Sequence, residues 1–378
     1  MSANAAGVSV RVPFGDLAQD YRSKRASIDA AVSRVLASGR FILGDEVRRF
    51  EEDLAAFLGV SHVVGCANGT EAIALALAAA GLKPGDEVVL PANTCAPTLA
   101  GVRMAGGRAV LADAEPKTLT LDADAAARAA GPAARFFLPV HLYGGVADLD
   151  GLALLAARRG ALLVEDCAQS HGASWKSRAT GSFGRAAAFS FYPSKNLGAY
   201  GDGGAVATNE AGVAERAREL RQYGWKRRDF SEVEGWNSRL DELQAAILRV
   251  KLAFLARENA RRREIADRYD AAFAALPLTL LAVRPGAVPA RHLYPVRTPM
   301  RDALREHLAA RGVETGIHYP TPLHLHPAYA FLGHRRGAFP VAEEACATVV
   351  SLPLHTALSD EQVAEVIAAV SAFFEEAR

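Results

Sequence analysis

The sequence predicts an α/β protein with a mostly parallel central sheet, helices on both of its faces, and a smaller C-terminal α+β domain. Three observations support this class. Short apolar runs alternate with helical patterns through the first two-thirds of the chain, one long helical pattern starts near Leu240, and prolines punctuate the remainder. Alternating strands and helices are typical of right-handed βαβ units, which form parallel sheets. A chain of 378 residues is also long for one compact core.

The strands of this sheet are expected where short apolar runs are bounded by polar or turn residues. Between them the sequence predicts helices, for example over 71–80 and 152–159. In sheets of this kind ligands bind at the carboxyl ends of the strands, so polar residues that follow the runs are site candidates. The predicted strands are 62–66, 87–90, 109–112, 136–140, 162–165, 186–191 and 204–208.

The long helical pattern carries one apolar stripe with steps of three and four residues, which is typical of a packing face. The stripe consists of Leu240, Leu243, Ile247, Val250 and Phe254. Beyond about residue 257 the chain becomes arginine-rich and then rich in proline. We therefore expect a large domain over 1–256 and a small α+β domain over 257–378.

Charge and targeting patterns exclude several classes of protein. The chain has 43 basic and 42 acidic residues, so nothing indicates general attraction to nucleic acid or to acidic membranes. The first twelve residues lack the layout of a signal peptide. The longest apolar stretch, 72–80, is too short to cross a bilayer. We expect a soluble cytoplasmic protein with neither a nucleic-acid nor a membrane partner.

Metal and disulfide chemistry is not indicated. The cysteines are far apart and form no CxxC pair, so they suggest neither a zinc site nor a disulfide framework. His318, His324 and His326 lack the helical i, i+4 spacing of metal-binding pairs, and nearby prolines break any helix. A loop lining the mouth of an active site is the favoured interpretation of these histidines.

Lys195 and Asp166 are the strongest candidates for chemistry. Lys195 follows the apolar run 186–191 and lies among small residues, a poor place for a solubilising lysine but a good one for an amine that forms an imine. Asp166 ends another apolar run, and Gln169 follows it. Pyridoxal phosphate needs a carboxylate at its pyridinium nitrogen and a lysine at its aldehyde, while Gln169 could donate to its phenolic oxygen. The alternatives are a surface lysine and a helix-capping aspartate.

A phosphate seat is predicted between the strand 62–66 and the alanine-rich helix that follows. Gly69 and Thr70 stand at the start of that helix, where free N–H groups and the helix dipole favour an anion. The alternative is an ordinary helix cap made by Asn68 or Thr70. Ser190 precedes Lys195 by five residues and could bind phosphate from the same loop.

Taken together, these motifs resemble the DegT/DnrJ/StrS family of pyridoxal phosphate-dependent nucleotide-sugar aminotransferases. The resemblance covers almost the whole chain, and many long matches in one order are highly specific. The matching segments are 12–17, 39–44, 68–70, 85–88, 139–144, 165–172, 189–204, 237–252, 316–320 and 351–354.

The resemblance implies a fold type I aminotransferase that acts as a homodimer, with each active site built from both subunits. It implies that Lys195 carries the cofactor as an imine, that Asp166 meets the pyridine nitrogen and that Gln169 meets the phenolic oxygen. The phosphate contacts that it implies are Gly69, Thr70 and Ser190 in one subunit and Asn237 reaching the partner subunit's phosphate.

One departure from the family pattern concerns the face of the cofactor ring. The family usually places an aromatic residue there, and the corresponding position is Cys95. Stacking must then come from a thiol contact or from another residue. Substrate contacts are expected from the loops around Arg227, His318 and Tyr319, partly across the dimer.

The sequences of 192–198 and 237–246 resemble those of family members that aminate C3 of dTDP-3-keto-6-deoxyhexoses. The usual amino donor in this family is glutamate. UDP-linked 3-keto uronic acids and 4-keto sugars stay open as substrates. Some relatives carry histidine in place of the lysine and are dehydratases, and Lys195 argues against that branch. A non-catalytic regulator on the same scaffold is a distant alternative.

Overall fold

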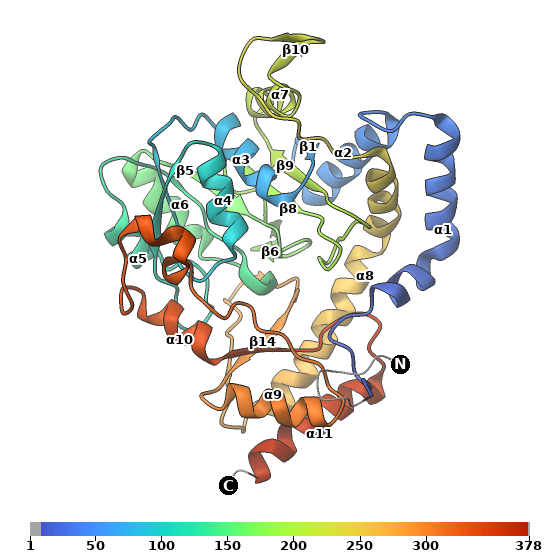
Figure 1. Cartoon of the computed structure of the whole chain (residues 1–378), viewed down its shortest axis with the longest axis vertical. Helices are drawn as coiled ribbons and strands as arrows, with labels where there is room; N and C mark the ends of the chain where they lie inside the picture. Colours follow the sequence, from blue (N-terminus) through green and yellow to red (C-terminus); the bar gives the residue numbers. More distant parts are fainter. Residues whose placement is uncertain (1–8, 377–378) are drawn as a thin grey trace.

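The computed structural model describes residues 9–376 and contains a seven-stranded sheet in the order β1-β9-β8-β5-β4-β2-β3 (Figure 1). Residues 1–8, part of the segment without a signal layout, lie outside the described residues. β9 runs antiparallel to both of its neighbours, and the other pairs are parallel. The strands are β1 (His62–Cys66), β2 (Glu87–Pro91), β3 (Arg108–Ala112), β4 (Ala134–Phe137), β5 (Leu162–Asp166), β8 (Ala186–Ser190) and β9 (Gly204–Thr208).

The predicted fold class is confirmed, and all seven predicted strands form. The largest difference is in β4, which was expected over 136–140 and spans Ala134–Phe137. Pro139 lacks a backbone N–H and cannot donate to a neighbouring strand. The chain returns to the sheet only as an isolated bridge between Val140 and Asp166.

Helices cover both faces of the sheet because alternate strand residues point to opposite sides. In β2, Val88 and Leu90 pack with helices α3, α4 and α7, whereas Val89 packs with α5 and α6. The helices around the sheet are α2 (Asp45–Leu58), α3 (Gly69–Ala79), α4 (Ala96–Met104), α5 (Ala123–Ala129), α6 (Leu149–Arg159) and α7 (Ala211–Leu220).

The long helix α8 (Glu242–Phe273) starts two residues after the beginning of its apolar stripe and belongs to two cores. Its first half packs against the sheet through Ala245 and Leu248, and against α1 (Leu17–Ser38) through Ala246. Its second half supports a separate core. Because α8 runs through residue 256 without a break, one rigid element joins the two parts, and the division at 256/257 stays a prediction.

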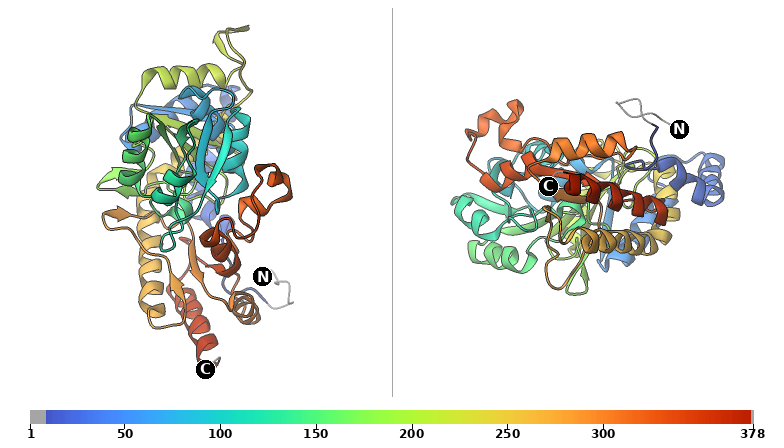
Figure 2. Two further views of the ribbon diagram at one scale, coloured as in Figure 1. Left: turned by 90° about the vertical axis from the view of Figure 1, so that its left-hand side faces the viewer. Right: turned by 90° about the horizontal axis from the view of Figure 1, so that it is seen from below.

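The second core contains a three-stranded antiparallel sheet in the order β12-β14-β15. Residues such as Tyr269 and Phe273 of α8 pack there with α9 and α11. Figures 1 and 2 show this part at the lower end of the molecule. Its elements are β12 (Thr279–Leu280), β14 (Tyr294–Arg297), β15 (Val349–Leu352), α9 (Arg301–Ala310) and α11 (Asp360–Glu376). The helix α10 (Pro340–Thr348) packs instead through Ala342 with the core that contains α3 and α4.

A short hairpin projects from the opposite end of the molecule, beyond α7 (Figures 1 and 2). It is formed by β10 (Trp225–Arg227) and β11 (Phe230–Ser231). No helix within residues 9–376 has both the length and the apolar character needed to span a bilayer. The remaining elements are β6 (Ser174–Trp175), β7 (Arg178–Ala179), β13 (Ala287–Val288), η1 (Leu142–Gly144), η2 (Leu323–Leu325) and η3 (Pro327–Leu332).

Candidate active site

A cavity of about 660 Å³ lies at the carboxyl ends of the parallel strands, between the large sheet and the second core. Its wall is made by the starts of α3 and α4, the end of β5, the loop after β8, and segments of the C-terminal part. The candidate residues that line it are Gly69, Thr70, Cys95, Asp166, Gln169, Ser190, Lys195, His318 and Tyr319.

Lys195 faces this cavity from the loop that follows β8. Its backbone N–H donates to the carbonyl of Tyr192 at 2.8 Å, which closes a tight turn. The loop needs Gly198, because a Cβ there would lie 2.3 Å from the carbonyl oxygen of Pro193. Burial lowers the pKa of Lys195, although the charges of Asp166 and Cys95 oppose the shift. Among residues 9–376, no carboxylate forms an ion pair with this amine.

Asp166, at the end of β5, is a buried carboxylate held by two donors. The N–H of Ala168 donates to Oδ1 at 3.0 Å, and the hydroxyl of Thr98 donates to Oδ2 at 2.9 Å. Burial raises the pKa of Asp166, while these hydrogen bonds and the Lys195 charge lower it. A buried charge is costly without a partner. A protonated ring nitrogen of pyridoxal phosphate fits this acceptor and its position opposite a lysine.

Gln169 is oriented by two tyrosines. Its Oε1 accepts the backbone N–H of Tyr143 at 2.5 Å, so its Nε2 must be the donor side of the amide. That nitrogen donates to the hydroxyl of Tyr319 at 3.1 Å. Tyr319 is carried by the C-terminal part of the chain, and the hydroxyl of Tyr143 donates to the carbonyl of His318 in the same segment. The second N–H of Gln169 is therefore left for a ligand.

At the predicted phosphate site, Asn68 caps the helix α3, and the first backbone amides of that helix stay free. Asn68 caps α3, because its Oδ1 accepts the N–H of Glu71 at 2.9 Å and its Nδ2 donates to the Glu71 carboxylate. Gly69 and Thr70 then retain amides that have no acceptor within the helix. A Cβ on Gly69 would lie 2.5 Å from Cβ of Ser190. Glycine thus lets the start of α3 pack against Ser190. All three phosphate candidates, Gly69, Thr70 and Ser190, line the cavity.

Cys95 is the N-cap residue of α4, and it lines the cavity together with Tyr319. Burial raises the pKa of Cys95, so it remains a thiol near neutral pH. The aromatic residues that line the cavity are Phe14, Tyr192 and Tyr319. The thiol of Cys95 and these rings are the candidates for stacking on a bound ring.

The structure adds cavity residues that the sequence reasoning missed. Thr98 holds Asp166, and His292 donates through its Nδ1–H to Oδ1 of Asn196 at 3.1 Å, next to Lys195. Burial and the Lys195 charge hold the pKa of His292 well below its usual range, so its imidazole is neutral. Neither residue belongs to a motif with its own spacing signal, because their partners are distant in sequence.

Two candidates lie outside the cavity. Arg227 is on the projecting hairpin, where its guanidinium stacks on Phe230 at 4.4 Å. Asn237 is exposed beside a bridge to Gln222. The structure therefore does not bring Arg227 or Asn237 to the site of its own chain.

Two of the three histidines in the 318–326 segment, His324 and His326, have hydrogen-bond partners within the protein. His324 Nε2 lies 2.9 Å from the Glu343 carboxylate, and His326 Nε2 lies 3.2 Å from the carbonyl of Thr321. Only His318 of the three lines the cavity, where it stacks on Phe14.

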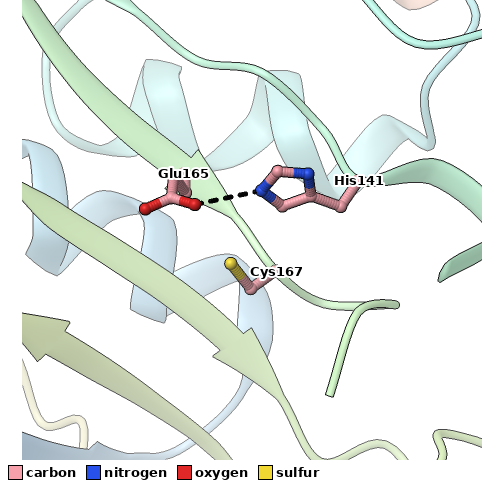
Figure 3. A group of neighbouring side chains, drawn as sticks. All are labelled: His141, Glu165 and Cys167. Carbon is pink, nitrogen blue, oxygen red and sulfur yellow. Dashed lines mark hydrogen bonds and ion pairs between the residues drawn. The ribbon is translucent and has the colours of Figure 1, made fainter. Parts of the chain in front are cut away.

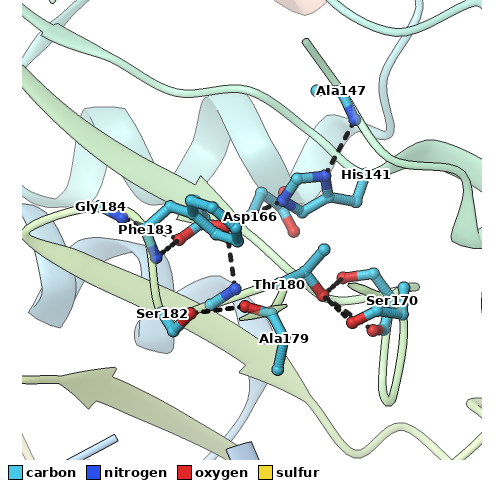
Figure 4. Close-up of polar contacts among 12 residues, drawn as sticks. His141, Ala147, Asp166, Ser170, Ala179, Thr180, Ser182, Phe183 and Gly184 are labelled. Atoms are coloured by element: carbon cyan, nitrogen blue, oxygen red, sulfur yellow. Dashed lines mark hydrogen bonds and ion pairs between the residues drawn. The ribbon is translucent and has the colours of Figure 1, made fainter. Parts of the chain in front are cut away.

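His141, Glu165 and Cys167 form a buried group behind Asp166 whose spacing would suit a metal ion (Figure 3). The bonding pattern identifies a structural clamp instead. Glu165 accepts three backbone N–H groups from the turn 181–184. His141 Nε2 donates to Glu165 at 3.1 Å (Figure 3). His141 Nδ1 accepts the N–H of Ala147 (Figure 4). The imidazole of His141 and the carboxylate of Glu165 therefore already have hydrogen-bond partners. Burial raises the pKa of Cys167, which keeps it a thiol.

Replacing Glu165 by alanine is expected to destabilise the fold by about 3–5 kcal/mol, because four donors, two of them fully buried, lose their acceptor at once. The measurement is urea unfolding of Glu165→Ala beside the milder Glu165→Gln. Zinc or a chelator is expected to leave the unfolding midpoint of the unchanged protein where it was. A metal-dependent midpoint would show that the group binds an ion.

The fold and the cavity define the class: an α/β enzyme with a lysine and a carboxylate at the carboxyl edge of the sheet. Residues 22–371 match the model of the DegT/DnrJ/EryC1/StrS aminotransferase family, and the chain belongs to this family. A curated relative from Streptomyces venezuelae, dTDP-3-amino-3,4,6-trideoxy-alpha-D-glucose transaminase, is 46% identical over 361 residues, which cover 95% of each chain. The predicted family and the aminotransferase activity are confirmed.

Solved structures agree. The S. venezuelae protein DesV, crystallised with a ketimine intermediate, matches with a TM-score of 0.95 and 46% identity over 97% of this chain and 99% of DesV. NtdA from Bacillus subtilis, with bound PMP, matches with a TM-score of 0.90 and 28% identity over 99% of this chain and 87% of NtdA. Fold type I and the pyridoxal phosphate cofactor are thereby confirmed at the level of the family.

Proposed function

We propose that this protein transfers the amino group of glutamate to a keto nucleotide sugar, and that the acceptor is C3 of a dTDP-3-keto-6-deoxyhexose. The observation that carries the proposal is the joint placement of Lys195 and Asp166 in one cavity at the sheet edge. The dTDP-sugar transaminase that is 46% identical over nearly the full length supports this choice of acceptor. A cytoplasmic location stays a prediction.

Pyridoxal phosphate, when bound, supplies an electron sink for the substrate carbon that loses its proton. Asp166 would hold the ring nitrogen protonated, and Gln169 would donate its free N–H to the phenolic oxygen. The first amides of α3 would hold the phosphate together with the hydroxyls of Thr70 and Ser190. These groups come from β5 and the loop after it, from α3 and from β8, so the fold orients the ring without help from the substrate.

Lys195 would hold the cofactor's aldehyde and later move the proton between substrate and cofactor carbons. Both tasks require the neutral amine. Because burial lowers its pKa, a larger fraction of Lys195 is neutral near physiological pH than of an exposed lysine. As the pH falls through this lowered pKa the amine gains a proton, so the rate of cofactor capture is expected to decline on the acid side.

We propose a homodimer in which each site is completed by the partner. Arg227 and Asn237 lie outside the cavity of their own chain but are exposed and close to the projecting hairpin. In this proposal, Asn237 meets the cofactor phosphate across the interface and Arg227 contacts the substrate there. An isologous interface places the same residues on both sides, so both sites are completed equally.

Mixing two inactive variants is expected to restore activity. Lys195→Ala lacks the amine, and Asn237→Asp places a negative charge against the partner's phosphate. A 1:1 mixture refolded together gives half mixed dimers, each with one intact site, so about a quarter of the normal activity is expected. Each variant mixed with itself is the control. No recovery in mixtures that mass measurement shows to contain mixed dimers would place both residues in one chain's site.

The substrate assignment is tested by a screen of dTDP- and UDP-linked 3-keto and 4-keto sugars with glutamate, read by mass. The expected result is a gain of an amine on the dTDP-3-keto-6-deoxy sugar with one 2-oxoglutarate formed per product. Turnover of the UDP-linked 3-keto uronic acid or of a 4-keto sugar would reassign the acceptor. Loss of water without 2-oxoglutarate would indicate a dehydratase.

A further inference from the structure

Two threonines, Thr94 just before α4 and Thr98 in its first turn, form a hydrogen-bonded chain that ends on Asp166. Oγ1 of Thr94 lies 2.9 Å from Oγ1 of Thr98, and Oγ1 of Thr98 lies 2.9 Å from Oδ2 of Asp166. Both threonines are 2% exposed and Asp166 is 3% exposed. The contact spans 68 positions in sequence and joins a helix start to the end of β5.

The direction of the chain follows from counting protons. An ionised carboxylate can only accept, and a threonine hydroxyl has one proton to donate. Thr98 must therefore give its proton to Asp166, so it is Thr94 that donates to Thr98. Two hydroxyl dipoles then point toward one carboxylate oxygen, while the N–H of Ala168 donates to the other oxygen. Hydrogen bonds to the charged form of an acid favour that form.

We propose that Thr98, supported by Thr94, is a positioning residue that keeps Asp166 ionised and aimed at the ring nitrogen of the bound cofactor. The inference rests on the proposed function, since it requires pyridoxal phosphate in this cavity. Without Thr98, the buried carboxylate has one donor in place of two, and the shared proton moves from the ring nitrogen toward Asp166. The ring then withdraws electrons less strongly.

The test uses the full chain loaded with pyridoxal phosphate labelled with ¹⁵N in the ring. The isosteric variant Thr98→Val is expected to move the ¹⁵N resonance toward that of an unprotonated pyridine. It is also expected to raise the cofactor dissociation constant about tenfold or more, as for loss of a hydrogen bond to a charged group. Thr98→Ser keeps the hydroxyl and is expected to keep both values.

Thr94 supplies an independent check of the direction. Thr94→Val is expected to shift the resonance in the same sense but by less, because Thr98 still donates to Asp166. The double variant is expected to match Thr98→Val, since the chain is already broken at its last link. Additive shifts would overturn the relay.

Stability separates positioning from a purely structural role. If Thr98→Val lowers the unfolding temperature but leaves the ring nitrogen protonated and the affinity equal to that of Thr98→Ser, the proposal is wrong. Should valine prevent folding, Thr98→Ala replaces it, because alanine and serine both lack the methyl group and differ in the hydroxyl. Failure of the unchanged chain to bind the cofactor would instead refute the proposed function.

Discussion

Lys195→Ala is expected to lower kcat of transamination by about 10⁴-fold or more, because the proposed function assigns this one residue both covalent capture of the cofactor and proton transfer. The nearby amines cannot replace it. Lys251, which also lines the cavity, is ion-paired with Asp20 at 2.8 Å. Lys24 is paired with Asp20 and Glu258.

Two measurements check this expectation apart from the rate. The unchanged protein with pyridoxal phosphate is expected to show a visible absorption band and, after borohydride reduction, added cofactor mass on the peptide that contains Lys195. Lys195→Ala is expected to show neither. Lys176→Ala is the matched control, because Lys176 is exposed and its amine contacts Asp150 and the ring of Trp175 at the surface, away from the cavity. An unchanged band in Lys195→Ala would refute the assignment of the amine.

Much of this site could be predicted from sequence, because its residues follow strands whose carboxyl ends lie at one edge of the sheet. Apolar runs identify the strands, and the polar residues that follow them must meet at the carboxyl ends. Lys195 and Asp166 could be identified in this way, since Asp166 comes directly after such a run and Lys195 lies in the loop that follows another. Glu165 lies at the end of a predicted strand, so its place near the sheet edge could be predicted. Its role as a hydrogen-bond acceptor could not, because its donors lie in the turn 181–184 and at His141, far away in sequence.

The parts that could not be predicted depend on contacts between distant segments. Asn68 and Thr70 were equal candidates for a cap, and only the geometry assigns that role to Asn68. Thr98 carries no local pattern that separates it from an ordinary helix threonine. The same holds for α8, whose stripe shows that it packs but not that it runs from one core into another.

Asp166→Asn is expected to slow the half-reaction with glutamate by about 10²–10³-fold, as when one partner of a buried charge pair is truncated. The amide has nearly the same shape but cannot neutralise a protonated ring nitrogen. Because Lys195 is intact, the visible band is expected to persist in this variant, which distinguishes it from Lys195→Ala. Stopped-flow mixing of the loaded enzyme with glutamate measures the rate. A half-reaction as fast as that of the unchanged protein would mean that another group holds the ring nitrogen.

The same substitution is expected to stabilise the protein when the cofactor is absent. Burial raises the pKa of Asp166 above its unfolded value, so the folded state binds this proton more readily than the unfolded chain. Stability is then lost as the pH rises through the folded pKa, and an amide at this position has no such loss. Unfolding of the cofactor-free proteins is expected to show Asp166→Asn as the more stable at neutral pH, with the gap closing as the pH falls toward 4. A gap that stays constant with pH would mean that Asp166 titrates alike in both states. If the measurement agrees, the carboxylate carries a cost in stability without the cofactor, as expected for a residue with the proposed role of holding the ring nitrogen.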